Sequence, residues 1–424
     1  MGLAASPISR GPLHLPIARG GPGAARPFRG ASTQAIAAVL VATGQSLNSI
    51  RNTIVQATTT LGKMPVGGAS IKNWAFSATN EEHVGHWSEL ASAVDFTEET
   101  LQSPLVGMID GIKSAFSQVY AGTIAIGARP LDKLHAANTA QNAQAMIWRL
   151  CELARAGGYI PKVQFYHAHS EANAAAGTLE QPYFDQDMAY LTQLQAWAAQ
   201  AMGEPAYFAP VVLDVPAPGT ITGLTYQEVK AAIRRVAAEL PNGIYMGGKY
   251  HWECEADRAH QVAPACVQRG EAAGRLLAQH YLGETIEEAL EVVSAVIEGG
   301  GTMLATFNHN IVRDAAFENF GTVFTEAPDG FEWYDNGSAV TISNIEYLAN
   351  AVRLTPAAPI SGTADQQQLR IASQTHTGSL AVWPENIAGS LIRVDEAGWA
   401  SSIDPSYINY RWASPQVFND VEAA

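Results

Sequence analysis

Short apolar runs alternate with longer stretches of helical spacing over residues 35–283. Apolar runs rich in β-branched residues predict buried strands, and apolar residues at three- and four-residue spacing predict amphipathic helices. The predicted strands are residues 36–43, 118–126, 162–167, 207–215 and 244–249. The predicted helices are residues 142–155, 184–202, 226–240 and 269–281. This alternation predicts an α/β fold with a doubly wound, flavodoxin-like, five-stranded parallel sheet and right-handed crossovers.

The pattern changes toward the C-terminus. Residues 301–424 consist of short alternating segments separated by Gly, Pro, Asn and Asp, which predicts a smaller β-sandwich domain that could bind carbohydrate. An acidic stretch of helical spacing followed by Gly299–Gly301 predicts a helical linker over residues 284–300. Residues 1–34 are rich in Pro and Gly and predict an extended arm, whereas residues 48–116 show little periodicity and could hold an insertion near the site.

Composition and charge narrow the function classes. The chain has 424 residues and a formal net charge of −15, which argues against a nucleic-acid partner because phosphate binding needs a basic surface. The longest apolar runs, such as residues 36–42, are far too short to span a bilayer, and the N-terminus lacks the apolar block of a secretory signal. Cys151, Cys254 and Cys266 have no CxxC spacing and are expected to be buried free thiols.

The first candidate for chemistry is Gly44-Gln45-Ser46, directly after the first predicted strand. Ligands of open α/β sheets bind outside the carboxyl ends of the strands, so this loop opens onto the expected crevice. A serine at the start of a helix also gains from backbone N–H groups that stabilise a nearby oxyanion. On its own, however, the tripeptide fits a helix N-cap better than a nucleophile.

Three further blocks follow later predicted strands. Asp257 and His260 form a D-x-x-H motif that could activate a serine hydroxyl, because an imidazole accepts its proton and a carboxylate holds the imidazole in one tautomer. Polar residues continue from the third strand through the segment YHAHSEAN at 166–173, where a purely structural network is the alternative. Gly127 follows the second strand, where a bare backbone could approach a ligand.

These four blocks, in this order, resemble those of the SGNH hydrolases, and the sialate O-acetylesterase and carbohydrate-esterase branch with its phage-encoded relatives is the most similar group. The resemblance covers about residues 35–283. It implies the SGNH-hydrolase fold, with Ser46 as nucleophile, His260 as general base and Asp257 as the residue that orients His260. The backbone amides of Ser46 and Gly127 would form part of the oxyanion hole.

The third block supplies the remaining oxyanion donor and departs from the family pattern. Ser170 stands where the family usually has Gly, and Asn173 stands where it usually has an acid. His169 is the first choice for the donor side chain, and Asn173 is the second. The supporting residues implied by the resemblance are Gln45, Asn48 and Glu171.

The expected function is therefore that of a carbohydrate O-acetylesterase, a carboxylic ester hydrolase that needs no cofactor and acts on O-acetylated carbohydrate. Trp74, Trp87 and Trp252 could stack on a sugar ring, although core packing is the favoured interpretation for them. The phage-type resemblance and the N-terminal arm suggest a virion fibre or spike component that assembles as a homo-oligomer or into a larger particle. Without such an association, a chain with no signal peptide is expected in the cytoplasm.

Two alternatives remain open. His167, His169 and Glu171 alternate, so on a strand they would share a face and could hold Zn or Mn together with Asp257 or His260, as in a metal-dependent hydrolase. The other alternative is a glycan-binding or structural virion protein on the same fold without enzymatic activity, because fold alone does not establish function.

Overall fold

The structure is a computed structural model that describes part of the chain. The described ranges are 35–44, 58–65, 93–97, 104–124, 137–168, 180–215, 225–248, 250–252, 261–314, 328–372, 390–402 and 404–424. Residues Gln34–Ala424 form one compact unit. The predicted N-terminal arm, residues 1–34, lies outside the described residues.

A seven-stranded sheet forms the centre of the α/β region, with the strand order β3-β2-β4-β1-β5-β6-β7. Its strands are β1 (Ile36–Gly44), β2 (Thr58–Pro65), β3 (Ala93–Thr97), β4 (Val119–Thr123), β5 (Ile160–Ala168), β6 (Val211–Val215) and β7 (Gly243–Gly248). All neighbouring strands pair in parallel except β2 and β3. The five predicted strands are all present, and their order, second-first-third-fourth-fifth, is the flavodoxin-like order.

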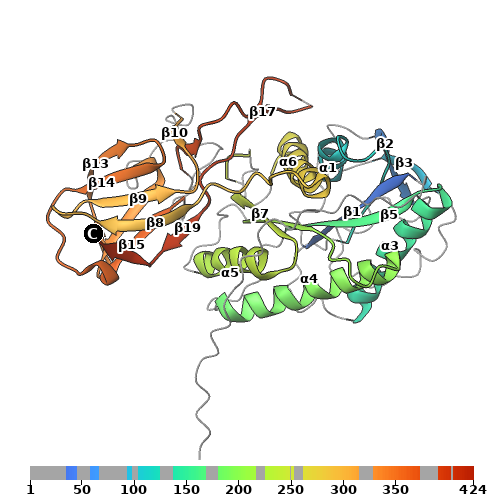
Figure 1. The fold of residues 1–424 in the computed structure, drawn as a ribbon, viewed down its shortest axis with the longest axis horizontal. Coiled ribbons are helices and arrows are strands. Elements are labelled where there is room, and N and C mark those ends of the chain that lie inside the picture. Colours follow the sequence, from blue (N-terminus) through green and yellow to red (C-terminus); the bar gives the residue numbers. More distant parts are fainter. Residues whose placement is uncertain are drawn as a thin grey trace, which may run out of the picture. The chain divides into compact units, whose positions relative to one another are not determined.

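Helices cover both faces of this sheet (Figure 1). One face is covered by α3 (Ala137–Ala156), α4 (Glu180–Met202) and α5 (Thr225–Glu239), and the other by α1 (Leu105–Ile112) and α6 (Ala263–Leu282). The predicted helices thus correspond to α3, α4, α5 and α6. None of the described helices is both long enough and apolar enough to cross a bilayer.

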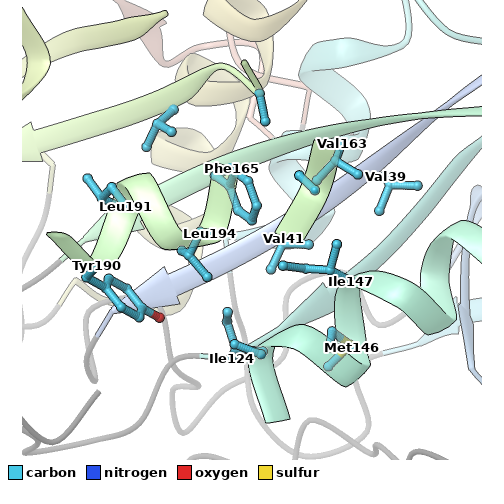
Figure 2. Close-up of a cluster of buried hydrophobic side chains, with 14 of the residues drawn as sticks. Val39, Val41, Ile124, Met146, Ile147, Val163, Phe165, Tyr190, Leu191 and Leu194 are labelled. Atoms are coloured by element: carbon cyan, nitrogen blue, oxygen red, sulfur yellow. The ribbon is translucent and has the colours of Figure 1, made fainter. Parts of the chain in front are cut away.

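The sequence of β1 is apolar at successive positions because both faces of this central strand are buried. Val39 and Val41 pack against the α3, α4 and α5 side, whereas Leu40 and Ala42 pack against α1 and α6. Figure 2 shows Val39 and Val41 among side chains contributed by α3, α4 and β5. Each buried valine or leucine contributes roughly 1.5–3 kcal/mol, so a strand buried on both faces must be apolar at successive positions.

Residues 48–116, whose pattern predicts little regular structure, contain β2, β3 and α1. The two strands extend the sheet beyond β4. Their sequences, TTTLGKMP and AVDFT, are short and include Gly, Pro and Asp, which strands disfavour. Strand β3 is the edge strand and β2 lies between β3 and β4, and neither sequence has the continuous apolar run that marks the central strands.

The β-rich C-terminal region is confirmed and contains several sheets. The larger ones have the strand orders β13-β14-β9-β8-β20 and β12-β11-β15-β19, and short pairs join β10 to β16 and β17 to β18. A single apolar cluster contains Phe307 of β9 and Leu354 of β14 from one sheet with Trp333 of β11 and Ile371 of β15 from the other, so the two larger sheets share a core.

The strands of this region are β8 (Val292–Ile297), β9 (Met303–Phe307), β10 (Ile311–Arg313), β11 (Phe331–Asp335), β12 (Ser338–Val340), β13 (Ile342–Tyr347), β14 (Ala351–Pro356), β15 (Gln367–Ile371), β16 (Ile392–Val394), β17 (Trp399–Ala400), β18 (Ile408–Asn409), β19 (Gln416–Phe418) and β20 (Val421–Ala423). Two short 3₁₀ turns, η6 (Pro328–Gly330) and η7 (Ala364–Gln366), precede β11 and β15.

The predicted helical linker over residues 284–300 is wrong. Residues Val292–Ile297 form strand β8, which pairs antiparallel with β9. The run VVSAVI is rich in β-branched residues, which pack well on a pleated sheet, and this preference outweighs the helical spacing of the acidic residues around it. The glycine run is the hairpin turn between the two strands, where Gly300 and Gly301 have φ values of 102° and 79°.

Candidate functional site

The residues predicted to carry the chemistry lie outside the described residues. They are Ser46, Asp257 and His260, the oxyanion candidates Gly127, His169 and Asn173, and the supporting Gln45, Asn48 and Glu171. The structure describes the strand ends that precede each of these blocks. It also describes buried side chains that contact residues at the ends of β1 and β5.

The carboxyl ends of the parallel strands lead directly into the predicted blocks. Gly44, the last residue of β1, is in register with Ala168, the last residue of β5. Ser46 therefore follows one member of this pair by two residues, and His169 directly follows the other. On the other side of β1, Ile124 after β4 donates its backbone N–H to the carbonyl of Ala42 at 2.8 Å. The segments after β1, β4 and β5 therefore all begin at the edge formed by the carboxyl ends of the parallel strands. Ligands of such sheets bind at this edge.

Gly44 is the residue on which this arrangement depends. Its φ of +116° lies in a region that side-chain-bearing residues rarely adopt. A Cβ atom at this position would lie 2.0 Å from the carbonyl oxygen of Ala168. A glycine is therefore required both by the backbone conformation and by the close approach of β5.

Helix α4 ties these two strand ends from one face of the sheet. The Tyr190 and Thr43 hydroxyls are 2.6 Å apart, and Nε2 of His167 lies 3.0 Å from Oδ1 of Asp187. All four side chains are buried, and Figure 2 shows Tyr190 lying beside Leu191 and Leu194 of the same helix. Because Asp187 and Tyr190 are three residues apart, they project from neighbouring positions on one helix surface.

A second buried polar group lies on the opposite face. The Tyr166 hydroxyl donates to Oδ2 of Asp214 at 2.5 Å, and the guanidinium of Arg269 lies 4.0 Å from the same carboxylate. Arg269 also donates to Oε1 of Gln261 at 2.8 Å and stands over the Tyr166 ring. Burial, more than the neighbouring Asp214 carboxylate, raises the pKa of Tyr166 well above its usual value, so this phenol stays protonated.

These contacts have a supporting role. A buried charge is tolerated when it is paired and hydrogen-bonded, and removal of one partner is far more costly than the pair itself. Tyr166 and His167, which open the predicted third block, are held by Asp214 and Asp187. The contacts of Tyr166 and His167 with these buried carboxylates agree with the structural-network alternative, whereas the role of His169 and the residues after it stays a prediction.

Sequence reasoning missed Asp187, Asp214, Arg269 and Tyr190 as partners of these strand ends. The available signal was a charged residue at a position where the periodicity demands an apolar one, as for Asp214 in the strand VVLDV. That signal indicates that a buried partner exists. It does not say which of the many distant residues the partner is.

The predicted metal alternative has one described member. His167 is paired with Asp187, and among the described ranges no group of three or more His, Cys, Asp or Glu side chains has the arrangement of a metal site. Cys151 and Cys266 are buried free thiols, as expected, and burial raises the pKa of Cys151 to about 12. Cys254 lies outside the described residues.

The aromatic candidates divide between core and surface. Trp252 is buried, which agrees with the core-packing alternative, and Trp333 and Trp412 of the β-rich region are buried as well. Trp399, Tyr407 and Tyr410 are partly exposed, whereas Trp74, Trp87 and Trp383 lie outside the described residues.

Comparison with known proteins gives the fold a wider context. No protein-family model matches the sequence, and no curated protein matches it. Among solved structures, a carbohydrate acetylesterase from Xanthomonas citri is similar, with a TM-score of 0.52 and 12% identity over 90% of this chain and 80% of that chain.

Two further solved structures are less similar. A protein from Arabidopsis thaliana has a TM-score of 0.39 and 15% identity over 58% of this chain and 97% of its own. A carbohydrate acetylesterase from Sinorhizobium meliloti has a TM-score of 0.34 and 11% identity over 57% of this chain and 99% of its own.

At these identities a structural likeness concerns the fold and not the activity. The Xanthomonas structure matches across most of the chain, and the strand order β4-β1-β5-β6-β7 is that of a doubly wound sheet. The chain therefore has the doubly wound α/β fold of the carbohydrate acetylesterase from Xanthomonas citri, joined to a β-rich C-terminal region.

Proposed function

We propose that this protein is a serine esterase that removes O-acetyl groups from carbohydrate, with Ser46, His260 and Asp257 as its catalytic residues. The observation that carries the proposal is the pairing of Gly44 with Ala168 at the carboxyl edge of the sheet. Two of the four SGNH-type blocks begin within two residues of this pair in the sequence. The fold shared with a carbohydrate acetylesterase supports the same reaction class.

The proposed reaction is a two-step acyl transfer. The Ser46 hydroxyl attacks the carbonyl carbon of the acetyl ester while His260 accepts its proton, and His260 then donates that proton to the leaving sugar hydroxyl. Water repeats the sequence on the acetyl-enzyme and releases acetate and free Ser46. Asp257 holds His260 in the required tautomer and stabilises the imidazolium that forms.

The oxyanion of each tetrahedral intermediate needs hydrogen-bond donors that are already in place. We assign this role to the backbone amides of Ser46 and Gly127 and to the side chain of His169, with Asn173 as the alternative donor. Each preorganised donor is worth roughly 100- to 1,000-fold in turnover. The rigid supports described above, Thr43–Tyr190 and His167–Asp187, favour such preorganisation because they immobilise the strand ends from which these segments start.

The test is release of acetate from a panel of O-acetylated glycans by the full chain and by Ser46→Ala. The variant is expected to lose roughly a thousandfold or more of the activity, because a triad nucleophile has no substitute. Ser49→Ala is the matched control, since it removes a hydroxyl three residues away and should retain full activity. Equal release by the wild type and Ser46→Ala would overturn the assignment.

The same assay separates the predicted alternatives. A metal-dependent hydrolase would lose activity in EDTA and tolerate Ser46→Ala, which is the reverse of the serine mechanism. A wild type that releases no acetate from any glycan in the panel would indicate a binding protein on a hydrolase fold. Virion association, homo-oligomerisation and cellular location stay predictions, to be tested by the mass of the purified particle and by fractionation.

A further inference from the structure

A small pocket lies where the end of β7 and helix α6 meet the last part of the β-rich region. Its volume is about 40 Å³, and its lining includes His251, Trp252, Arg275, Trp399, Asn409 and Trp412. A cavity needs about 10–15 Å³ to hold one water, so this pocket takes a group of a few heavy atoms and not a whole sugar ring.

Asn409, which lines this pocket, has a side-chain donor without a partner in the described part of the chain. Its side chain is 3% exposed, and its Oδ1 accepts a hydrogen bond from the indole Nε1 of Trp252 at 3.2 Å. An indole N–H can only donate, so this contact fixes which end of the amide is the oxygen. Nδ2 is then a buried donor, and within the described ranges it has no hydrogen-bond partner.

His251 also lines this pocket and has a buried ring nitrogen. Its side chain is 6% exposed, and its ring lies 4.0 Å from the Trp252 ring and 6.1 Å from the Trp412 ring, measured between centroids. Burial lowers its pKa to about 3, so the imidazole is neutral near neutral pH. Nδ1 is buried without a hydrogen-bond partner in the described structure, and it is an acceptor when the proton is on Nε2.

The charges around the pocket are already neutralised. Arg275 forms a two-point ion pair with Glu287, at 2.6 and 3.2 Å. Arg411, which also lines the pocket, pairs with Glu396 at 2.7 Å. An anionic ligand would have to compete with these carboxylates for the guanidinium groups, so the lining favours a neutral ligand.

We propose that this pocket binds the acetamido group of an N-acetylated sugar. Its carbonyl oxygen accepts from Nδ2 of Asn409, its N–H donates to Nδ1 of His251, and its methyl packs on the indoles of Trp252 and Trp412. Trp399 is half-buried and provides a ring face for the sugar that carries the group. The donor, the acceptor, the apolar walls, the small volume and the neutral lining each match this group.

An alkyl group alone would leave both polar atoms unsatisfied, whereas a hydroxyl could satisfy both but has no methyl group to pack on the indoles. A buried polar atom without a partner costs about 1–3 kcal/mol, so a secondary amide has a clear advantage over an alkyl group, and its methyl group gives it additional apolar contact that a hydroxyl lacks. The proposal goes beyond the esterase reaction and does not depend on it, because no residue of the pocket is one of the proposed catalytic residues.

The first experiment uses ligand-observed NMR on the full chain, with the methyl glycosides of N-acetylglucosamine and glucose as probes. We expect saturation transfer to be strongest at the acetamido methyl, and the N-acetylated probe to bind at least tenfold more tightly than the glucoside. N-methylacetamide should compete with it. Equal affinity for the two glycosides, or saturation spread evenly over the sugar protons, would overturn the proposal.

The second experiment removes the donor while keeping the shape. Asn409→Asp retains an acceptor for Trp252 and should weaken binding of the N-acetylated probe about tenfold. Asn419→Asp, the same change at an exposed position, should leave binding unchanged. If Asn409→Asp fails to fold, the wild-type comparison of the two glycosides still decides the question.

Ser46→Ala separates this inference from the proposed function. It should bind the N-acetylated probe as the wild type does while releasing no acetate. Binding without esterase activity in the wild type would leave the pocket assignment intact and remove the esterase assignment. Acetate release without selective binding would do the reverse.

Discussion

The Nε2 atom of His167 lies 3.0 Å from Oδ1 of Asp187, and both side chains are almost completely buried. His167 is the next-to-last residue of the central strand β5, and Asp187 belongs to the helix α4 that covers this strand. Their contact connects the start of the predicted third block to α4. Through Tyr190 and Thr43, the same helix is also connected to the end of β1.

Asp187→Ala should destabilise the protein by about 1–3 kcal/mol, because it removes the carboxylate that pairs with the buried His167 imidazole. Urea unfolding followed by far-UV circular dichroism measures the change. Asp185→Ala removes an exposed carboxylate from the same helix and should change the free energy of unfolding by less than about 0.5 kcal/mol. Equal effects of the two substitutions would contradict a supporting role for the pair.

Gly44→Ala should lower both stability and esterase activity. The new Cβ would overlap the carbonyl of Ala168, so the ends of β1 and β5 would have to separate. Gly203→Ala is the matched control, because Gly203 also has a positive φ of +72° but has no atoms near its Cβ position. The control should lose only about 1–2 kcal/mol from backbone strain and retain acetate release. If both variants behave alike, the close approach of β5 has no functional importance.

Substitutions at Tyr166 and Asp214 should lower the free energy of unfolding by different amounts. Tyr166→Phe removes one hydrogen bond to a carboxylate that still has Arg269 nearby, at a cost of about 1.5–3 kcal/mol. Asp214→Ala leaves the fully buried Arg269 without its carboxylate and should cost about 3–5 kcal/mol. Chemical denaturation of the two variants provides the comparison, and the reverse order would contradict the assigned network.

His251 should make the protein less stable in mild acid. Its pKa in the folded state is lowered by burial to about 3, so between pH 6.5 and 3 the unfolded chain binds a proton that the folded chain does not. Stability contributed by the neutral imidazole is therefore lost as pH falls, by about 2 kcal/mol between pH 7 and pH 5. The measurement is urea unfolding of the wild type and His251→Phe at both pH values. An identical pH dependence in both proteins would exclude His251 as its cause.

His169 and Asn173 compete for the role of oxyanion donor. His169→Ala should lower kcat for acetate release roughly 100- to 1,000-fold with a much smaller change in KM, because the donor acts on charge that develops in the transition state. Asn173→Ala should have a smaller effect if His169 is the donor. A larger kcat loss in Asn173→Ala would reverse the assignment.

The central strands were predictable because they are buried on both faces. In β1, for example, eight consecutive residues from Ala37 to Gly44 are buried, so the sequence has to be apolar along its length. Strands β2 and β3, the last two strands on one side of the sheet, are short and contain Gly, Lys, Pro or Asp, so their sequences give no comparable signal. Strand β8 was mistaken for a helix because acidic residues around a β-branched run produce helical spacing.

The candidate site was predictable only in part. The order of its blocks along the chain could be read directly, whereas contacts such as Tyr166 with Asp214 join residues separated by 48 positions. Nothing local to VVLDV distinguishes a buried carboxylate that binds Tyr166 from one that faces solvent. The pocket beside Asn409 was also not predictable, because its lining comes from two regions that sequence analysis treats as separate domains.

Strand β8 lies between β9 and β20 in its sheet, with Ala295 in register with Val421 of β20 and with Ala305 of β9. An expressed fragment that begins at residue 302, just past the glycine run, would therefore lack the strand to which both neighbours are hydrogen-bonded. It would expose two unpaired strand edges, which favours aggregation. Dissection of the protein for separate study of its C-terminal region has to cut before residue 290, so that the hairpin stays whole.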